Sequence, residues 1–221
     1  MKDLSKIKFW LFDLDNTLYS GDTKVFDQVD KKMSKFISEK LNVSLEEAKK
    51  IQKNYFHEYN TTLNGMIKNH DINANEFLEF VHDVDLEFLK EDEPLKTEIE
   101  KLKGKKIIFT NGSRAHASNV TSRIGIEQLF DGVFDIVDSD FYPKPSIEPY
   151  KKIIENYKIV PEYCIFFEDI ARNLKPAYEL GMKTVWIENN EPWAAKYSDE
   201  EFVNYKTGSL TNFLKEINEH R

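Results

Sequence analysis

Short apolar runs alternate with longer amphipathic stretches along most of the chain. The apolar runs cover residues 9–12, 107–109, 133–137, 165–167 and 184–187, and each is too short for a helix. Helices are expected at residues 113–124, 147–157 and 170–180, and Gly125 and Gly181 follow two of them, where helices commonly end. A last strand at 202–205 and a helix at 209–217 complete the pattern. Strands alternating with helices in this way predict an α/β fold built on a doubly wound parallel sheet.

The alternation is interrupted between residues 19 and 93. This stretch has no strand pattern, and its apolar residues recur at helical spacing, for example at positions 29, 33, 36, 37 and 41. We interpret it as an all-helical insert after the first strand, with residues 91–94 as the linker back. The predicted domains are therefore an α/β core at residues 1–18 and 94–221, and a helical domain at residues 19–93.

Composition narrows the classes of partner. The 221 residues are 40% hydrophobic, which is enough for a packed core, and the formal net charge is −8. Such an acidic chain argues against binding to nucleic-acid polymers or anionic membranes, because both require a basic face. No apolar run approaches the ~18 residues of a membrane span. The single cysteine, Cys164, allows no internal disulfide. A cytoplasmic location is the resulting expectation.

Two carboxylates follow the first predicted strand. Asp13 and Asp15 are two residues apart in an extended segment, so their side chains point to the same side. In open α/β sheets, ligands bind beyond the carboxyl ends of the strands. An acidic loop without function is one alternative. A calcium-binding loop is a second, but it would need glycine and glutamate where this chain has Leu18 and Lys24.

Two further segments carry groups that suit phosphate. Thr110, Asn111 and Gly112 follow the strand at 107–109. A hydroxyl there can bond a phosphate oxygen, and backbone N–H groups leading into a helix favour anions. Lys144 lies between two prolines on a stiff extended segment and can supply the local cation that an acidic chain needs to attract phosphate. Alone, the first segment is also an ordinary turn, and the lysine is more simply one of many solvated lysines.

A second acidic pair, Glu168 and Asp169, follows the strand at 165–167. Such a pair can simply cap a helix. If all these strand ends share one edge of the sheet, however, both pairs crowd one pocket, where like charges cannot all ionise cheaply. One lysine cannot neutralise four carboxylates, whereas a divalent cation can. Oxygen ligands of this kind suit Mg²⁺, which also accepts a substrate phosphate oxygen.

In this order, the four motifs resemble those of the haloacid dehalogenase superfamily of aspartate-nucleophile phosphatases. The resemblance covers the whole chain and implies a class I helical cap inserted after the first strand. Residues 55–66, 81–85 and 167–174 are similar to the bacterial and fungal pyrimidine 5′-nucleotidase branch. That branch usually has glycine where this chain has Asn60, and asparagine tolerates the left-handed backbone better than most residues, so the turn is expected to persist.

The resemblance implies a role for each residue at the strand ends. Asp13 is the nucleophile and Asp15 the general acid and base, with Lys144 completing the catalytic set. Phosphate would be bound by Thr110, Asn111, Gly112 and Lys144. Mg²⁺ would be bound by Asp13, by the backbone carbonyl of Asp15 and by Asp169, with Glu168 as a direct or water-mediated ligand. Supporting positions are Thr17 and Asn173, and candidate specificity positions are Tyr19, Thr61, Thr62 and Asn64.

Several alternatives remain at this point. The implied activity is hydrolysis of a phosphomonoester, specifically a UMP- or CMP-type nucleoside monophosphate. A sugar phosphate or phosphoglycolate as substrate, a mutase, and a noncatalytic module that holds Mg²⁺ and phosphate are the rivals. A dehalogenase would not need Asp15 as an acid. Tyr55 and Tyr59 either stack on a base or form the core of the cap, and His57, His70 and His82 are interpreted as structural or solvated.

Overall fold

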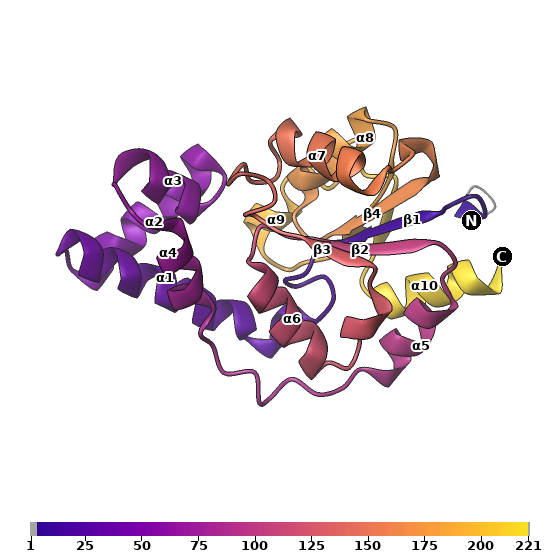
Figure 1. Cartoon of the computed structure of the whole chain (residues 1–221), viewed down its shortest axis with the longest axis horizontal. Coiled ribbons are helices and arrows are strands. Elements are labelled where there is room, and N and C mark those ends of the chain that lie inside the picture. The colour runs from indigo at the N-terminus through magenta and orange to yellow at the C-terminus, as the bar shows by residue number, and fades with distance from the viewer. Residues whose placement is uncertain (1–3, 221) are drawn as a thin grey trace.

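The computed structural model describes residues 4–220 and is built on a six-stranded, all-parallel sheet (Figure 1). The strands are β1 (Phe9–Phe12), β2 (Lys105–Phe109), β3 (Gly132–Phe134), β4 (Cys164–Glu168), β5 (Lys183–Ile187) and β6 (Tyr205–Thr207). Their order in the sheet is β3-β2-β1-β4-β5-β6. From β1, which lies inside the sheet, β2 and β3 follow towards one edge. The chain then crosses back, and β4, β5 and β6 follow on the other side of β1 towards the opposite edge. The predicted doubly wound fold is therefore confirmed.

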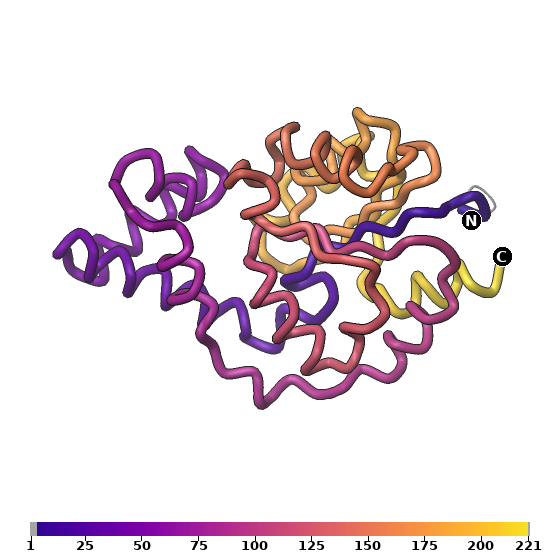
Figure 2. Tube along the Cα trace, in the orientation of Figure 1, coloured from indigo at the N-terminus to yellow at the C-terminus, as the bar shows by residue number. Residues whose placement is uncertain are grey.

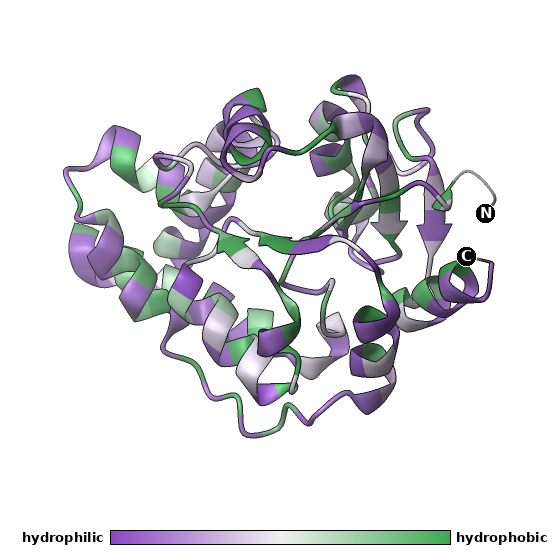
Figure 3. Ribbon diagram, turned by 45° about the vertical axis from the view of Figure 1, so that its right-hand side comes forward, coloured by the Kyte–Doolittle hydropathy of each residue, from purple (hydrophilic) through white to green (hydrophobic). Residues whose placement is uncertain are grey.

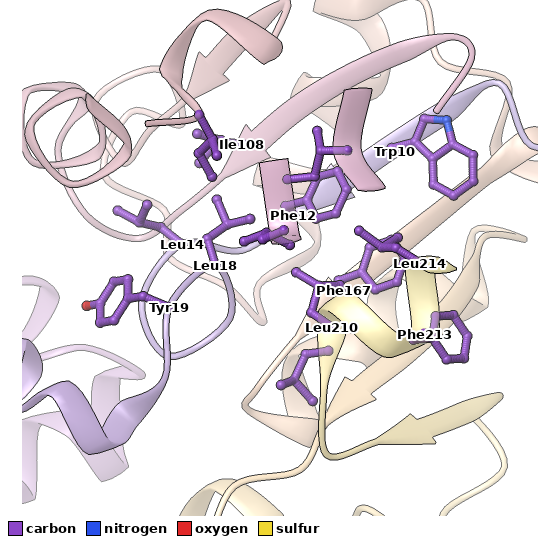
Figure 4. Close-up of a cluster of buried hydrophobic side chains, with 14 of the residues drawn as sticks. Trp10, Phe12, Leu14, Leu18, Tyr19, Ile108, Phe167, Leu210, Phe213 and Leu214 are labelled. Carbon is purple, nitrogen blue, oxygen red and sulfur yellow. The ribbon is translucent and has the colours of Figure 1, made fainter. Parts of the chain in front are cut away.

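Helices cover both faces of this sheet. One face packs against α5 (Glu93–Lys101), α6 (Arg114–Arg123) and α10 (Leu210–Glu219), and the other against α7 (Ile147–Tyr157) and α8 (Leu174–Glu179). Along β1, Trp10 and Phe12 enter the first layer and Leu11 enters the second, as the two-residue repeat of a strand requires. Figure 3 shows the hydrophobic strands between the more polar outer helices, and Figure 4 shows the first layer in detail.

The helical insert comprises α1 (Val25–Leu41), α2 (Leu45–Tyr59), α3 (Thr62–Asn69) and α4 (Ala74–His82). These helices lie beyond the carboxyl ends of the strands, and the chain enters and leaves them through separate segments (Figures 1 and 2). They share a hydrophobic cluster of their own, to which Phe36, Ile37 and Phe77 contribute. Ile136, from the segment after β3, joins this cluster and so ties it to the sheet. The exact domain boundaries stay a prediction.

Two positions in the insert depend on backbone geometry. Asn60 ends α2 with a φ of 69°, so asparagine does adopt the left-handed turn expected there. Gly65 lies against α2 so closely that a Cβ atom would come within 2.3 Å of Cγ of Tyr55. The close approach of α3 to α2 therefore requires a glycine at this position.

Four element boundaries differ from the prediction. The strand at 133–137 stops at Phe134, because Oδ1 of Asp135 accepts hydrogen bonds from the backbone N–H groups of Val137 and Asp138 and turns the chain. Residues 91–94 are not a simple linker, because α5 already starts at Glu93, with a proline in its first turn and Asp92 as its N-cap.

The other two differences lie in the last third of the chain. The helix expected from residue 170 begins only at Leu174, after a 3-10 turn over Ala171–Asn173. Its first turn contains Pro176, where no intrahelical donor is needed. The last strand is Tyr205–Thr207 rather than 202–205. A short helix, α9 (Pro192–Ala195), was not expected. Across the described part of the chain, no helix has both the length and the apolar character that crossing a membrane demands.

Candidate active site

The carboxyl end of β1 places Asp13 in the middle of the sheet edge. Its backbone N–H donates to the carbonyl of Phe167 at 2.9 Å and so extends the pairing of β1 with β4. Asn16, with a φ of 61°, then turns the chain so that Thr17 faces back, and the Thr17 hydroxyl donates to Oδ2 of Asp13 at 3.3 Å. Asp13 is only 6% exposed. The carboxylate is thus held in a fixed orientation at the start of the loop.

Lys144 lies directly against this carboxylate. Its Nζ donates to Oδ1 of Asp13 at 2.6 Å, to Oε2 of Glu168 at 2.7 Å and to the carbonyl of Phe109 at 2.9 Å. All three donors of the ammonium are therefore paired, and the side chain is buried. Asn111 fixes the backbone of Lys144 from both sides, because its Oδ1 accepts from the Lys144 N–H and its Nδ2 donates to the Lys144 carbonyl. The side chain of Asn111 thus positions the lysine.

Asp13, Glu168 and Asp169 form a compact acidic cluster. One carboxylate oxygen from each lies within 4.8 Å of the others. Burial and the charge of Glu168 raise the pKa of Asp13 to about 7, against the opposing effect of Lys144. Burial together with Glu168 and Asp13 raises the pKa of Asp169 well above its usual value. A single ammonium does not balance these three groups, and buried carboxylate oxygens are the ligands that a hard divalent cation takes.

Neighbouring side chains hold Asp169 in place. Asn189, in the segment after β5, donates to Oδ2 of Asp169 at 2.8 Å, and Asn16 donates to the same oxygen at 3.5 Å. The indole of Trp186 donates to the Asp169 carbonyl at 2.7 Å. Asn173 is buried nearby, and its carbonyl accepts from Tyr150 at 2.5 Å, while its Oδ1 has no hydrogen-bond partner among residues 4–220. The sequence did not single out Asn189, since it follows no motif.

Thr110 and Gly112 line the same edge. Oγ1 of Thr110 accepts from the Gly112 N–H at 2.9 Å, so its own O–H is left as a donor. Ser113 then caps α6 by accepting from the N–H of His116. The hydroxyl of Thr110 and the backbone of Gly112 thus lie immediately before the N-terminus of α6, as expected from the sequence. They are at the same edge of the sheet as the acidic cluster.

Asp15 has a different environment from Asp13. Its Oδ1 accepts from the Tyr19 hydroxyl at 2.5 Å and is 2.8 Å from Nε2 of His116. Burial alone would raise the pKa of Asp15, but the nearby His116 and the hydrogen bonds from His116 and Tyr19 lower it to about 2. Figure 4 shows the Tyr19 ring beside Leu14 and Leu18 with its hydroxyl pointing away from them. Tyr19, predicted as a specificity position, thus contacts Asp15 directly.

Two histidines lie at this site. The sequence did not single out His116, and its pattern predicted a structural or solvated role for His82. His116, on α6, is 1% exposed, and its ring stacks on that of His82 with a 4.4 Å centroid separation. Nδ1 of His82, the last residue of α4, lies 3.0 Å from Oγ of Ser113. Burial, and then the proximity of His116, lower the pKa of His82 to about 3. The available signal for His116 was its position in the first turn of a helix that starts directly after the Thr110–Gly112 turn.

The predicted specificity residues of the insert are engaged within it. Thr61 caps α3, the Thr62 hydroxyl donates to the carbonyl of Gln52, and Asn64 donates to the carbonyl of Tyr59. The hydroxyl of Tyr55 lies 2.7 Å from Nε2 of His70, and the Tyr55 ring packs edge-on against Tyr59. These contacts describe packing and capping, and a role in specificity stays a prediction.

A separate contact joins the insert to the far side of the site. The ring of Phe56, on α2, meets the indole of Trp193, on α9, edge-on at 5.2 Å. On the same ring lies the guanidinium of Arg172, 4.8 Å from the centroid. Arg172 is in the turn that follows Asp169, so the insert contacts the same segment that presents the acidic cluster.

Comparison with known proteins matches this arrangement to a family of hydrolases. A family model for haloacid dehalogenase-like hydrolases matches residues 7–181. The chain is 30% identical to phosphate metabolism protein 8 of Saccharomyces cerevisiae, over 95% of this chain and 70% of that protein. It is 28% identical to glyceraldehyde 3-phosphate phosphatase of Methanocaldococcus jannaschii, over 94% of this chain and 96% of that protein. A solved HAD phosphatase from Thermococcus onnurineus superposes with a TM-score of 0.63 at 19% identity, covering 96% of this chain and 98% of the other.

Proposed function

The chain belongs to the haloacid dehalogenase-like hydrolases, and from this premise we propose that it is a Mg²⁺-dependent phosphomonoester hydrolase with Asp13 as its nucleophile. The observation that carries the proposal is the division of the two carboxylates. Asp13 is buried against Lys144, whereas Asp15, on the loop after β1, accepts hydrogen bonds from Tyr19 and from His116 on α6. Cleavage of an alkyl phosphate needs both a nucleophile and an acid that protonates the leaving alkoxide, whereas displacement of a halide needs no such acid, because halide leaves without a proton.

In the first step, a carboxylate oxygen of Asp13 attacks phosphorus, the ester P–O bond breaks, and an aspartyl phosphate forms. Asp15 gives a proton to the leaving alkoxide. In the second step, Asp15 takes a proton from water, which attacks phosphorus and restores the Asp13 carboxylate. The ionised form favoured at Asp15 suits this second role, and the negative charge of an arriving phosphate would raise its pKa for the first. Thr110 and Lys144 would face the charge on the phosphoryl oxygens.

The donor set fits a divalent cation. The carboxylates of Asp13, Glu168 and Asp169 and the backbone carbonyl of Asp15 would hold it. When bound, Mg²⁺ would lower the raised pKa values of Asp13 and Asp169 and add positive charge for the phosphoryl oxygens. Asn189 would keep the Asp169 carboxylate in a ligating orientation.

Turnover of p-nitrophenyl phosphate tests the proposal. Phosphate release should require Mg²⁺, stop on chelation, and be absent in Asp13→Asn, which keeps the shape of the side chain. Acid quenching of the wild type with a ³²P-labelled ester should trap label on the protein, and Asp13→Asn should trap none. No release from any phosphate ester with Mg²⁺ would leave a binding module as the better description.

We further propose that helices α1–α4 act as a cap and that the substrate is a pyrimidine nucleoside 5′-monophosphate such as UMP or CMP. The support is the similarity of residues 55–66, 81–85 and 167–174 to the pyrimidine 5′-nucleotidase branch. A small sugar phosphate is the second candidate, because a relative of nearly equal length is named a glyceraldehyde 3-phosphate phosphatase. In a panel of phosphomonoesters, UMP or CMP should give the highest kcat/KM, and a higher value for a sugar phosphate would reverse the order of the two candidates.

A further inference from the structure

We propose that His116 is a positioning residue that fixes the carboxyl of Asp15 through one oxygen, so that the other oxygen alone exchanges protons with the substrate. This inference rests on the proposed function, in which Asp15 is the acid and base. Oδ1 of Asp15 receives both the Tyr19 hydroxyl and Nε2 of His116. Oδ2 accepts no hydrogen bond from any residue in the described range 4–220. Two donors occupy the lone-pair directions of Oδ1, which leaves Oδ2 for chemistry.

The surroundings of His116 restrict its ring to this orientation. The ring is buried and stacks nearly parallel on His82, at an interplanar angle of 12°. Because an ionised carboxylate only accepts, the hydrogen in the contact with Asp15 belongs to Nε2 of His116. Nδ1 of His116 has no hydrogen-bond partner among residues 4–220, so nothing there competes to turn the ring.

The unpaired nitrogen argues against a purely packing role for His116. A buried polar atom without a partner costs about 1–3 kcal/mol. A leucine has no polar side-chain atom and would carry no such cost. A role other than packing is therefore indicated for His116. Among residues 4–220, the hydrogen bond that its ring makes is the one to Asp15.

His82 brings the helical insert into the same arrangement. It is the last residue of α4, and its Nδ1 is bonded with Ser113 while its ring covers His116. The imidazole that holds Asp15 is thus pressed into place from the insert. Docking of α4 against α6 and the orientation of Asp15 are therefore coupled through one pair of stacked rings.

The chemical consequence depends on the leaving group. As the ester P–O bond breaks, its electron pair stays on the leaving oxygen, and Oδ2 of Asp15 supplies the proton that neutralises it. An alkoxide requires that proton, and correctly placed general acids contribute roughly 10²–10⁴-fold. A dinitrophenolate is stable without it. Loss of the orientation of Asp15 should therefore slow the cleavage of alkyl esters selectively.

The test compares two esters in the Mg²⁺-loaded full chain. In His116→Phe, which keeps a stacking ring but removes the donor, kcat/KM for UMP or another alkyl phosphate should fall about 10²-fold. For 2,4-dinitrophenyl phosphate, kcat/KM should fall no more than about threefold, because this constant stops at formation of the aspartyl phosphate. The kcat values should fall for both esters, since both share the second step. His116→Gln, which retains a side-chain N–H, should recover at least about tenfold of the loss with the alkyl ester.

Asp15→Asn provides the matched comparison. It should show the same selectivity for leaving groups, and the double variant with His116→Phe should lose no more than Asp15→Asn alone, since the two residues act as one unit. Thermal unfolding checks that each variant folds. If His116→Phe does not fold, His116→Leu takes its place in the test. Equal losses in kcat/KM with both esters, or additive losses in the double variant, would overturn the inference while leaving the proposed function intact. No turnover of any ester by the wild type would overturn both.

Discussion

Replacing Lys144 with methionine tests the charge balance of the site. Methionine has nearly the same length and keeps the apolar stem but removes the ammonium. Lys144 is 2% exposed, and its Nζ pairs with Asp13 and Glu168. The variant therefore leaves two buried carboxylates facing each other without the cation between them.

The expected cost follows from the burial of these groups. Removing one partner of a buried ion pair destabilises a protein by about 3–5 kcal/mol, because the remaining charge stays out of water. For a chain of this length, a loss of that size lowers Tm by roughly 6–20 °C. Phosphoester turnover should fall by about 10²–10³-fold, the usual cost of losing one donor that stabilises transition-state charge.

Thermal unfolding followed by circular dichroism measures the first effect, with Lys151→Met as the control. Lys151 is exposed on α7, so its replacement should change stability by less than about 0.5 kcal/mol. The double variant Lys144→Met with Glu168→Gln should recover about 1–3 kcal/mol, because one unpaired charge is removed. Saturating Mg²⁺ should stabilise Lys144→Met more than the wild type, since the cation then supplies the only positive charge in the cluster.

Two results would refute this reasoning. An unchanged Tm for Lys144→Met would show that the carboxylates do not depend on the lysine. A double variant less stable than Lys144→Met would show that Glu168 contributes through contacts other than the ion pair.

Three further predictions concern residues around the site. Gly65→Ala should lower stability by about 1–3 kcal/mol in a thermal melt, since its methyl group overlaps the ring of Tyr55, and an unchanged Tm would contradict this close approach. Asn189→Ala should weaken Mg²⁺ binding by about 10–100-fold in calorimetry, because the Asp169 carboxylate loses its donor, and equal affinity would exclude that support. Phe56→Ala should lower kcat/KM about 5–100-fold, because the indole of Trp193 and the guanidinium of Arg172 both lose the ring that they contact. The variant should also change tryptophan fluorescence. An unaltered kcat/KM would show that this contact does not serve catalysis.

The sheet could be predicted because its central strands β1, β4 and β5 are buried almost throughout. Five of the six strands lie on apolar runs that no helix of that length could use. The element boundaries that differ from the prediction depend on local hydrogen bonds and on exposed strands, which the hydrophobic pattern does not indicate. The side chain of Asp135 ends β3 by accepting backbone N–H groups, and the edge strand β6 has no buried residue to mark it.

The strand-end residues of the site were accessible for a related reason. Parallel strands bring their carboxyl ends to one edge, so Asp13, Lys144 and Glu168 could be expected to lie near each other before any contact was known. The contacts of His116 with Asp15 and of Asn189 with Asp169 could not be predicted, because each partner lies on a helix or loop whose placement only the folded chain defines. Tertiary packing, rather than motif spacing, selects such partners.

The acidic cluster also implies an order in which ligands arrive. Within residues 4–220, the carboxylates of Asp13, Glu168 and Asp169 lie together beside the ammonium of Lys144. A phosphate dianion that approaches the metal-free pocket therefore meets repulsion from each of these carboxylates that is ionised. A divalent cation meets attraction instead. If Mg²⁺ binds this cluster as proposed, the cation should enter first and the ester second, and the kinetics should be those of an ordered system. Its rate at low Mg²⁺ would report the supply of the metal rather than the supply of the ester.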